Sequence, residues 1–297
     1  MILAAAVCAR WVAGVENDME SPVQKVTVAH SPDADDAFMF YGLATGKIRS
    51  STVRFEHQLD DIQSLNDAAK EGRYEMTAIS YHAYPYVADK YILTSPGSSV
   101  GDGYGPLVVS KRTFSPDELK GKKVAVPGLQ TTAYLALRLY QPDFEALVVP
   151  FDQILERVQN GSVDAGLIIH EGQLMYDRGG LHRVVDLGAW WKQEHGLPLP
   201  LGANAILRRL SPDIQKECVD CLRASIRYAL DNRDEALRYA MEFSRGLDVA
   251  TAETFVGMYV NHHTTDMAPE VLESARKLLA MGFDAGLVTK KVDLEYV

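Results

Sequence analysis

The sequence predicts an α/β protein with two lobes, each a mostly parallel sheet flanked by helices, and a ligand cleft between them. Three observations favour this type II periplasmic-binding-protein-like architecture. Short apolar runs alternate with helical segments as far as residue 207, which is typical of parallel sheets. The remaining residues are helical and contain too few strand-like runs to form a sheet. The 297 residues are enough for two domains.

The first lobe opens with strand–helix alternation. Apolar residues recur with helical spacing over 33–45 and Gly46 ends that helix, whereas 53–59 alternates like a half-buried strand. We expect strands over 26–30, 53–59, 76–80 and 107–110, and helices over 33–45, 61–71 and 81–90.

The second lobe repeats this alternation, and the helical C-terminal part should pack back on the first lobe. Two crossings, near Gly105-Pro106 and near Gly202, would then join the lobes like a hinge. We expect lobe 1 at 25–106 plus 205–297, and an inserted lobe 2 at 107–204. The predicted strands are 124–126, 146–149, 165–169 and 203–207, and the predicted helices are 131–140, 152–159, 211–230, 233–243, 250–260 and 269–281.

The first residues, 1–24, do not look like part of the fold. Their apolar run lacks a basic start and is interrupted by Arg10, so it makes a poor signal peptide. We expect a poorly ordered or misassigned extension, with Met19 as an alternative start. No run approaches the ~20 apolar residues of a membrane span, and we expect a cytoplasmic protein without a membrane partner.

Charge and cysteine content narrow the function classes. A net charge of −10 disfavours nucleic acid and anionic membranes as partners, but a local pocket can still bind a small anion. Cys218-x-x-Cys221 has no second cysteine pair and no nearby histidine, so we interpret it as helix packing and expect no metal. The chain should be a monomer or homodimer.

Three loops at predicted strand ends are candidates for ligand binding. Ser31 to Asp36 lies between a strand and a helix, where anions and polar ligands bind, but three aspartates also suit an ordinary helix cap. Pro127 to Ala133 opens a helix with two threonines, which suits a carboxylate or simple capping. Gly97 to Gly105 contains no dinucleotide fingerprint and is either a ligand-facing loop or a flexible turn.

The sharpest feature is His170-Glu171 at the end of the predicted strand 165–169. An imidazole at a strand's carboxyl end in a dry cleft is well placed to act as a general base. The alternative is a histidine that is merely hydrogen-bonded at a strand end. A zinc-protease interpretation fails, because the sequence has no H-E-x-x-H motif.

Together these segments resemble the 1,4-dihydroxy-6-naphthoate synthase family, which acts on cyclic dehypoxanthinylfutalosine in menaquinone biosynthesis. The resemblance spans about residues 26 to 288. The segments that carry it are Ser31-Pro32 with Asp36, Phe38 and Phe40; Asp61 to Asn66; Ile79 to Tyr84; Gly103 to Leu107; Pro127-Gly128 with Thr131 to Ala133; Phe151-Asp152 with Ile154; Gly166 to Glu171; Asp186 to Gly188 with Trp190-Trp191; Gly196 to Gly202; and Tyr259 to Asn261 with Thr264 and Asp266.

The resemblance implies a periplasmic-binding-protein fold, His170 as the catalytic base and no cofactor. It also implies ligand contacts from Ser80 in lobe 1 and from Thr131 to Ala133 in lobe 2. To this set we add Ser31, Asp35 and Glu171, which lie at predicted strand ends. One departure stands out: the family's first motif usually reads Ser-Pro-Cys-Pro-Asn-Asp-Thr, whereas this chain has Asp33, Asp35 and Ala37 in place of Cys, Asn and Thr. The expected substrate-binding residues are Ser31, Asp35, Ser80, Thr131, Thr132, Ala133 and Glu171.

We therefore expect a carbon–carbon lyase that closes on a small anionic substrate. Two alternatives remain. Chorismate dehydratase is similar in fold, but the His170-Glu171 pair and the stretch from Trp190 to Gly202 favour the naphthoate synthase. A non-catalytic solute-binding protein would need an export signal that this sequence does not display.

Overall fold

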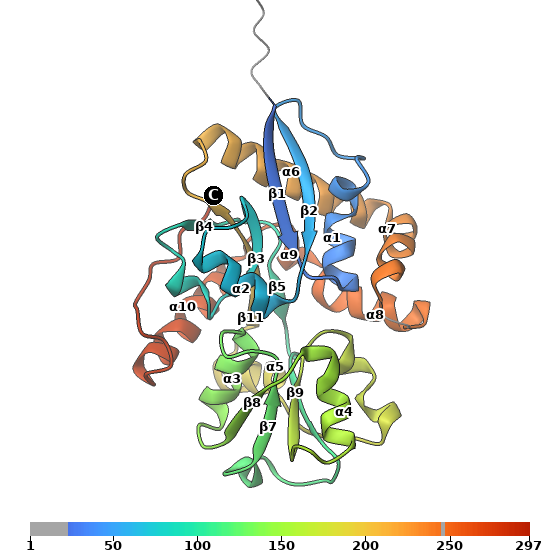
Figure 1. The fold of residues 1–297 in the computed structure, drawn as a ribbon, viewed down its shortest axis with the longest axis vertical. Helices are drawn as coiled ribbons and strands as arrows, with labels where there is room; N and C mark the ends of the chain where they lie inside the picture. The colour runs from blue at the N-terminus through green and yellow to red at the C-terminus, as the bar shows by residue number, and fades with distance from the viewer. Residues whose placement is uncertain (1–22, 245–246) are drawn as a thin grey trace, which may run out of the picture.

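The computed structural model describes residues 23–244 and 247–297 and contains two β-sheets, each with its own helices. Figure 1 shows the first sheet with the C-terminal helices in the upper part of the molecule and the second sheet below it. The predicted extension at 1–24 lies outside the described residues except for Val23 and Gln24. The first strand begins at Gln24, which pairs with Val53.

The first sheet combines parallel and antiparallel strands in the order β2-β1-β3-β11-β4, and β5 also pairs with β11. Strand β1 runs parallel to both β2 and β3, while β11 runs antiparallel to β3, β4 and β5. The strands are β1 (Gln24–His30), β2 (Val53–Leu59), β3 (Met76–Ser80), β4 (Tyr91–Leu93), β5 (Ser99–Gly101) and β11 (Leu199–Leu207).

The second sheet has the order β10-β6-β9-β7-β8. Strand β7 is parallel to β8 and β9, whereas β6 is antiparallel to β9 and β10. Both sheets are thus mixed rather than mostly parallel, because the strands near each lobe crossing return in the opposite direction. The strands are β6 (Leu107–Ser110), β7 (Lys123–Val126), β8 (Glu145–Val148), β9 (Ala165–Ile168) and β10 (His182–Asp186).

Helix α1 lies at the centre of the first lobe's larger core. It packs against α6, α7 and α8, so the C-terminal helices do cover the first sheet (Figure 1). Cys218 and Cys221 are buried in α6 within this core. The helices of this lobe are α1 (Ala34–Ala44), α2 (Ile62–Lys70), α6 (Pro212–Asp231), α7 (Arg233–Ala240), α8 (Val249–Tyr259), α9 (His262–Thr265) and α10 (Pro269–Asp284).

The second lobe carries three α-helices and several single 3₁₀ turns. Helix α4 covers β9 and β7, while α3 and α5 lie next to each other and to β11. The α-helices are α3 (Thr132–Tyr140), α4 (Ile154–Gln159) and α5 (Leu187–His195). The 3₁₀ turns among the described residues of both lobes are η1 (Tyr84–Tyr86), η2 (Pro116–Leu119), η3 (Phe151–Gln153), η4 (His170–Leu174), η5 (Tyr176–Gly179) and η6 (Met241–Phe243).

The two lobes share one continuous apolar core on the side of α3, α5 and α10. It joins Ile79 and Tyr84 of the first lobe to Val124 and Leu135 of the second. Trp191 of α5 is fully buried in this core, and its indole N–H donates to Ser274 Oγ of α10 at 2.8 Å. Any relative movement of the lobes must therefore preserve this seam.

Several details differ from the sequence-based expectations. The segment 81–90 was expected to be a helix, but it forms turns and only the short η1. Pro85 lies within it, and tertiary packing buries Tyr81 and Tyr84. Strand β11 begins at Leu199 and pairs with β5 of the first sheet, so the chain enters that sheet before residue 205. Strands β4, β5 and β10 and helix α5 were not expected, because short strands give too little periodic signal.

Among the described helices, none combines the length and the apolar character that crossing a membrane requires.

Gly188 allows the first crossing to pass directly over α5, and this contact predicts a strong effect on stability. A Cβ atom there would lie 1.9 Å from the carbonyl oxygen of Tyr104, which is backbone and cannot rotate away. We expect Gly188→Ala to lower the free energy of unfolding by at least about 2–3 kcal/mol in urea denaturation. Gly257→Ala, in the interior of α8 with room for a methyl group, is the control and should be neutral or stabilising by roughly 0.5–1 kcal/mol. Equal effects of the two changes would contradict the close approach.

Candidate functional site

A cavity lies between the two sheets and is lined by residues of both lobes. Its empty volume is ≈ 730 Å³, counting the part that is open to solvent. The segments that follow β1, β3, β7 and β9 converge on it. These are the carboxyl ends of strands in parallel pairs, where α/β proteins bind ligands.

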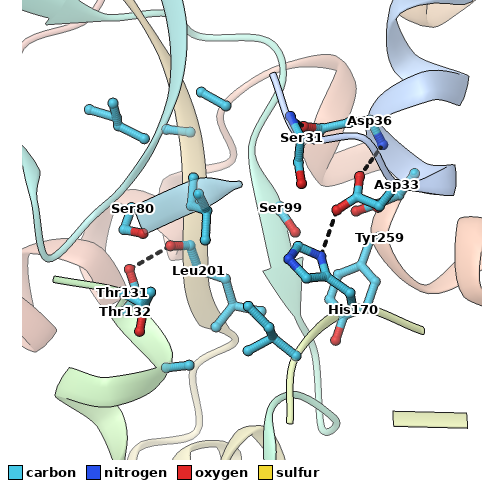
Figure 2. Close-up of a pocket in the computed structure, with 18 of the residues that line it drawn as sticks. Ser31, Asp33, Asp36, Ser80, Ser99, Thr131, Thr132, His170, Leu201 and Tyr259 are labelled. Atoms are coloured by element: carbon cyan, nitrogen blue, oxygen red, sulfur yellow. Dashed lines mark hydrogen bonds and ion pairs between the residues drawn. The ribbon is translucent and has the colours of Figure 1, made fainter. Parts of the chain in front are cut away.

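His170 is the first residue of η4 and lies between the two lobes. Its Nδ1 is 2.6 Å from Oδ2 of Asp33, while its Nε2 is buried without a hydrogen-bond partner. Figure 2 shows the ring between Asp33 and the open centre of the cavity, with Nε2 on the side away from Asp33. His170 therefore offers one ring nitrogen to whatever occupies the cavity.

The backbone of His170 is in the left-handed region with φ of 56°, and it is the one non-glycine residue with positive φ among those described. This conformation costs a non-glycine residue roughly 1–2 kcal/mol. The chain turns sharply there after β9 instead of continuing the strand, which places the imidazole over the cavity. The strained backbone is therefore what places the imidazole of the candidate base in this position.

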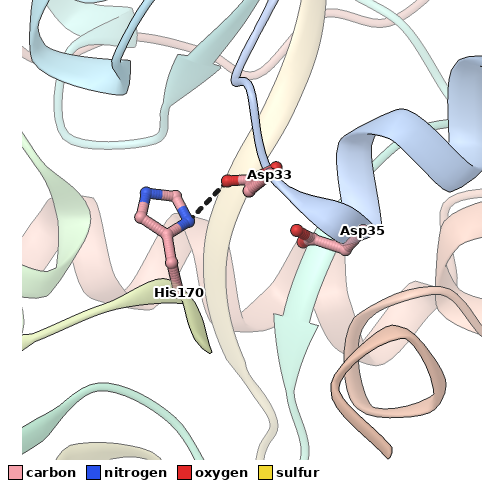
Figure 3. Close-up of side chains that lie close together, drawn as sticks. All are labelled: Asp33, Asp35 and His170. Atoms are coloured by element: carbon pink, nitrogen blue, oxygen red, sulfur yellow. Dashed lines mark ion pairs between the residues drawn. The ribbon is translucent and has the colours of Figure 1, made fainter. Parts of the chain in front are cut away.

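A group of buried carboxyl groups surrounds His170. Asp33 caps α1, accepting a hydrogen bond from Asp36 N through Oδ1 at 3.4 Å, and Asp36 Oδ2 accepts from Ser31 N at 2.7 Å. Asp35 projects from the first turn of α1, with one buried carboxyl oxygen that lacks a partner. Figure 3 shows Asp33, Asp35 and His170 side by side.

Burial and mutual repulsion change the charges of these groups. Burial raises the pKa of Asp35 well above its ordinary value, and the charges of Asp33 and Asp36 raise it further. Burial likewise raises the pKa of Asp36 to about 8. Burial alone would raise the pKa of Asp33, but the charge of His170 and hydrogen bonds from His170 and Asp35 bring it below its usual value. Asp33 is therefore the ionised member of the group, and Asp35 holds a proton.

The same carboxyl groups act on His170. Burial lowers the pKa of the imidazole, but the charge and hydrogen bond of Asp33 outweigh this, and Glu171 and Asp36 add to them, so the net pKa is raised above 6.5. His170 consequently favours the protonated form at a pH where an isolated histidine would be neutral.

The opposite side of the cavity is polar but holds no carboxylate. Asn66 of α2 holds Ser80 in two directions: Asn66 Oδ1 accepts from Ser80 N at 2.9 Å, and Asn66 Nδ2 donates to Ser80 Oγ at 3.0 Å. Ser80 Oγ therefore keeps its proton for a ligand. Beside it, the first N–H groups of α3, at Thr132 and Ala133, have no carbonyl within their own helix to bond to and give this end positive character (Figure 2).

The two threonine hydroxyls are engaged inside the protein. Thr131 Oγ1 donates to Gly128 O and accepts from Tyr134 N, which makes it the N-cap of α3. Thr132 Oγ1 donates to Leu201 O of β11 and so ties the second lobe to the first sheet (Figure 2). What this end offers an anion is therefore the helix N-terminus and Ser80 rather than the threonine hydroxyl protons.

Most of the predicted site residues come together here. The cavity wall contains His170 and six of the seven predicted substrate-binding residues, namely Ser31, Asp35, Ser80, Thr131, Thr132 and Ala133. Glu171 differs from the expectation. It lies outside the cavity wall, and its Oε1 accepts a hydrogen bond from Ala34 N at 3.3 Å, so it contacts the start of α1 instead of the cavity.

Other wall residues were not predicted as site residues. Asp33 belonged to a segment that was either a ligand-binding loop or a helix cap, and nothing in the sequence placed it beside His170, 137 positions away. Tyr259 of α8 also lines the cavity, and its hydroxyl donates to Gln173 of η4 at 2.7 Å. The polar Gln173 one helical turn after His170 was the available signal for a second contact from this segment.

Asp33, Asp35 and His170 also have the composition of a metal site. One ligand atom from each lies within 4.8 Å of the others. Two ligands of one metal ion with bonds near 2.1 Å would stand about 3 Å apart. The 2.6 Å contact between His170 and Asp33 has instead the length of a charge-assisted hydrogen bond, so the pair fits a shared proton better than a metal.

The amino-acid sequence is similar to a known protein family and to named enzymes. The family model for menaquinone biosynthesis matches residues 26–284. The chain is 40% identical over 265 residues to a 1,4-dihydroxy-6-naphthoate synthase of Thermus thermophilus, covering 89% of this chain and 96% of the relative. It is 36% identical over 267 residues to one of Streptomyces coelicolor, covering 88% and 94%.

Solved structures agree in fold. A crystal structure of a protein from Archaeoglobus fulgidus has a TM-score of 0.86 at 50% identity, covering 89% of this chain and 98% of that one. An alkanesulfonate-binding protein from Xanthomonas axonopodis has a TM-score of 0.70 at 14% identity, covering 92% and 97%. The latter shows the fold alone, which is that of periplasmic binding proteins, as expected from the sequence.

The buried carboxyl of Asp35 predicts a pH-dependent effect on stability. Because its pKa is raised in the folded state, the fold holds this proton more tightly than the unfolded chain does, and stability falls as the pH rises above about 4. Asp35→Asn removes the ionisable group and can still donate to Asp33. We expect its melting temperature to exceed that of the wild type by a few degrees at pH 9 and by less at pH 5, measured by calorimetry. The exposed Asp89→Asn should show no such pH dependence, and a constant difference at Asp35 would contradict its burial as an acid.

Proposed function

The chain belongs to the menaquinone-biosynthesis family and acts as a 1,4-dihydroxy-6-naphthoate synthase, a carbon–carbon lyase, and we propose that His170 is the general base of this reaction. The observation that carries the proposal is the Nε2 of His170, a buried nitrogen without a protein partner in the wall of a cavity shared by both lobes. A base must reach the proton that it removes, and this nitrogen is free to do so.

The two polar ends of the cavity define the orientation of the substrate. A carboxylate placed beside the ionised Asp33 would be repelled, whereas the N-terminus of α3 and the Ser80 hydroxyl attract it. The aromatic carboxylate of cyclic dehypoxanthinylfutalosine would therefore lie at Ser80 and Ala133. The sugar-derived part would lie at Ser31 and Asp35, where a protonated carboxyl and a hydroxyl can bond its hydroxyl groups.

In this orientation the base faces the part of the substrate that reacts. His170 Nε2 removes a proton from the sugar-derived part, the carbon skeleton fragments, and a three-carbon piece leaves. The aromatic ring of the dihydroxynaphthoate forms as the skeleton breaks, which supplies the driving force. The protein contributes orientation between two lobes and exclusion of water from the base.

The relatives also bear on the alternatives and on location. Both named relatives that align over most of the chain are naphthoate synthases, which favours this activity over a chorismate dehydratase or a solute-binding protein. Because the named relatives are biosynthetic enzymes, we propose a cytoplasmic location for this protein. Its partner is a small anionic substrate.

The base assignment predicts the outcome of one substitution. His170→Ala should lower kcat by a factor on the order of 10² to 10⁴ and leave KM nearly unchanged, because the imidazole acts on the proton and not on the carboxylate. Turnover is measured by incubating the purified protein with cyclic dehypoxanthinylfutalosine and detecting 1,4-dihydroxy-6-naphthoate by mass spectrometry.

His182→Ala, an exposed histidine on β10, is the matched control and should retain full activity. An unchanged kcat for His170→Ala would remove His170 from the mechanism. Failure of the wild type to form the naphthoate, with turnover of chorismate instead, would select the alternative enzyme.

The proposed orientation predicts a selective effect at Ser80. Ser80→Ala removes the hydroxyl that Asn66 holds for the carboxylate, so affinity for 1,4-dihydroxy-6-naphthoate should fall by about 1.5–3 kcal/mol, the contribution of a hydrogen bond to a charged group. Affinity for the corresponding dihydroxynaphthalene, which lacks the carboxylate, should not change. Isothermal titration of both ligands checks this, and an equal loss for the two would place the carboxylate elsewhere.

A further inference from the structure

The contact between His170 and Asp33 joins two segments that are distant in the sequence and belong to different lobes. His170 lies at the start of η4 in the second lobe, and Asp33 precedes α1 in the first. The side chain of Asp33 is 2% exposed and that of His170 is 14% exposed, so water competes little for either group. The 2.6 Å separation is that of a charge-assisted hydrogen bond.

Each oxygen of Asp33 has its own partner. Oδ1 accepts from Asp36 N at the start of α1, and Oδ2 contacts His170 Nδ1. An ionised carboxylate can only accept hydrogen bonds, so Nδ1 must carry a proton. In the neutral ring the other nitrogen, Nε2, then has a free lone pair, and this is the nitrogen that faces the cavity without a partner.

We propose that Asp33 is the positioning residue of the base: it fixes the His170 tautomer with the lone pair on Nε2, holds the ring over the cavity, and stabilises the imidazolium that forms when a proton is taken. This proposal rests on the proposed function, in which His170 is the base. Asp33 touches no reacting atom and acts through His170. The same logic operates wherever a buried aspartate orients a catalytic histidine.

A purely structural role of Asp33 as the cap of α1 is the competing explanation. Capping would account for Oδ1 but leaves the direction of Oδ2 and the strained backbone of His170 unexplained. Glu171, the next residue, accepts a hydrogen bond from Ala34 N at the same helix start. Two consecutive residues of the second lobe thus bind the N-terminus of α1, and the base is oriented only while the lobes are together.

The pH dependence of the reaction follows from the groups that face His170. These are Asp33 before α1, Asp36 within α1 and Glu171 on η4, and all of them raise the pKa of the imidazole. The reaction needs neutral His170, so kcat/KM of the wild type should rise with pH and level off above the ordinary histidine range. Removing the charge of Asp33 should move this acid limb to lower pH.

Asp33→Asn is the decisive variant. Asparagine is as good a helix cap as aspartate, so α1 should remain capped and the melting temperature nearly constant. Its amide N–H₂, however, would face Nδ1 and favour the opposite tautomer. We expect kcat to fall on the order of 10²- to 10⁴-fold and the acid limb of the pH profile to shift downward. Asp61→Asn, at the cap of α2 and outside the cavity wall, is the matched control and should change neither quantity.

A second measurement needs no substrate. In ¹⁵N spectra of histidine-labelled protein, recorded at a pH high enough for His170 to be neutral and with His170→Ala for assignment, the wild-type signal should report a proton on Nδ1, and Asp33→Asn should move it to Nε2. Wild-type turnover and pH profile in Asp33→Asn, or an unchanged tautomer, would overturn the proposal. Loss of activity in His170→Ala without a tautomer shift in Asp33→Asn would retain the base and reject its positioning by Asp33. Full activity in His170→Ala would instead reject the proposed base, while the spectra still decide the orientation.

Discussion

The site depends on the polar contacts that the second lobe makes with the N-terminus of α1. Asp33 and Ala34 begin this helix, and His170 and Glu171 bind them from the opposite lobe. The helix start itself is held by the core that α1 forms with the C-terminal helices, so a large part of the first lobe supports one imidazole. The seam around Trp191 joins the lobes on another side of the cleft.

The two ends of the cavity differ in electrostatic character. Carboxyl groups gather at α1, while the opposite end presents a helix N-terminus and a serine fixed by Asn66. Burial keeps the carboxyl groups from all being charged, because a low-dielectric site cannot hold several like charges close together. The acidic end can therefore donate hydrogen bonds as well as accept them. A molecule with an acid at one end and hydroxyl groups at the other matches this arrangement.

The sequence was most informative where physical periodicity is strong. Long helices such as α6 and α10 and the parallel units around β1 and β7 were predicted within a few residues. Strand ends pointed to His170 and Thr132, and the family resemblance pointed to Ser80, and all three line one cavity. Local sequence patterns do not reveal which distant residue a side chain will contact. Asp33 has the signature of a cap, and it is a cap, but its second oxygen meets a residue 137 positions away. The side chain of Glu171 turned away from the cavity for the same reason: its partner, Ala34 N, is fixed by tertiary structure.

The left-handed backbone of His170 gives a selection at this position two opposing consequences. Glycine adopts this conformation without steric strain, which would relieve roughly 1–2 kcal/mol, but removing the imidazole would leave the buried carboxylate of Asp33 without its partner. A laboratory selection for heat resistance would accordingly accept glycine here only together with an uncharged residue in place of Asp33. In a genome, a homologue with glycine here would be recognisable as a protein that has kept the cleft and given up the chemistry.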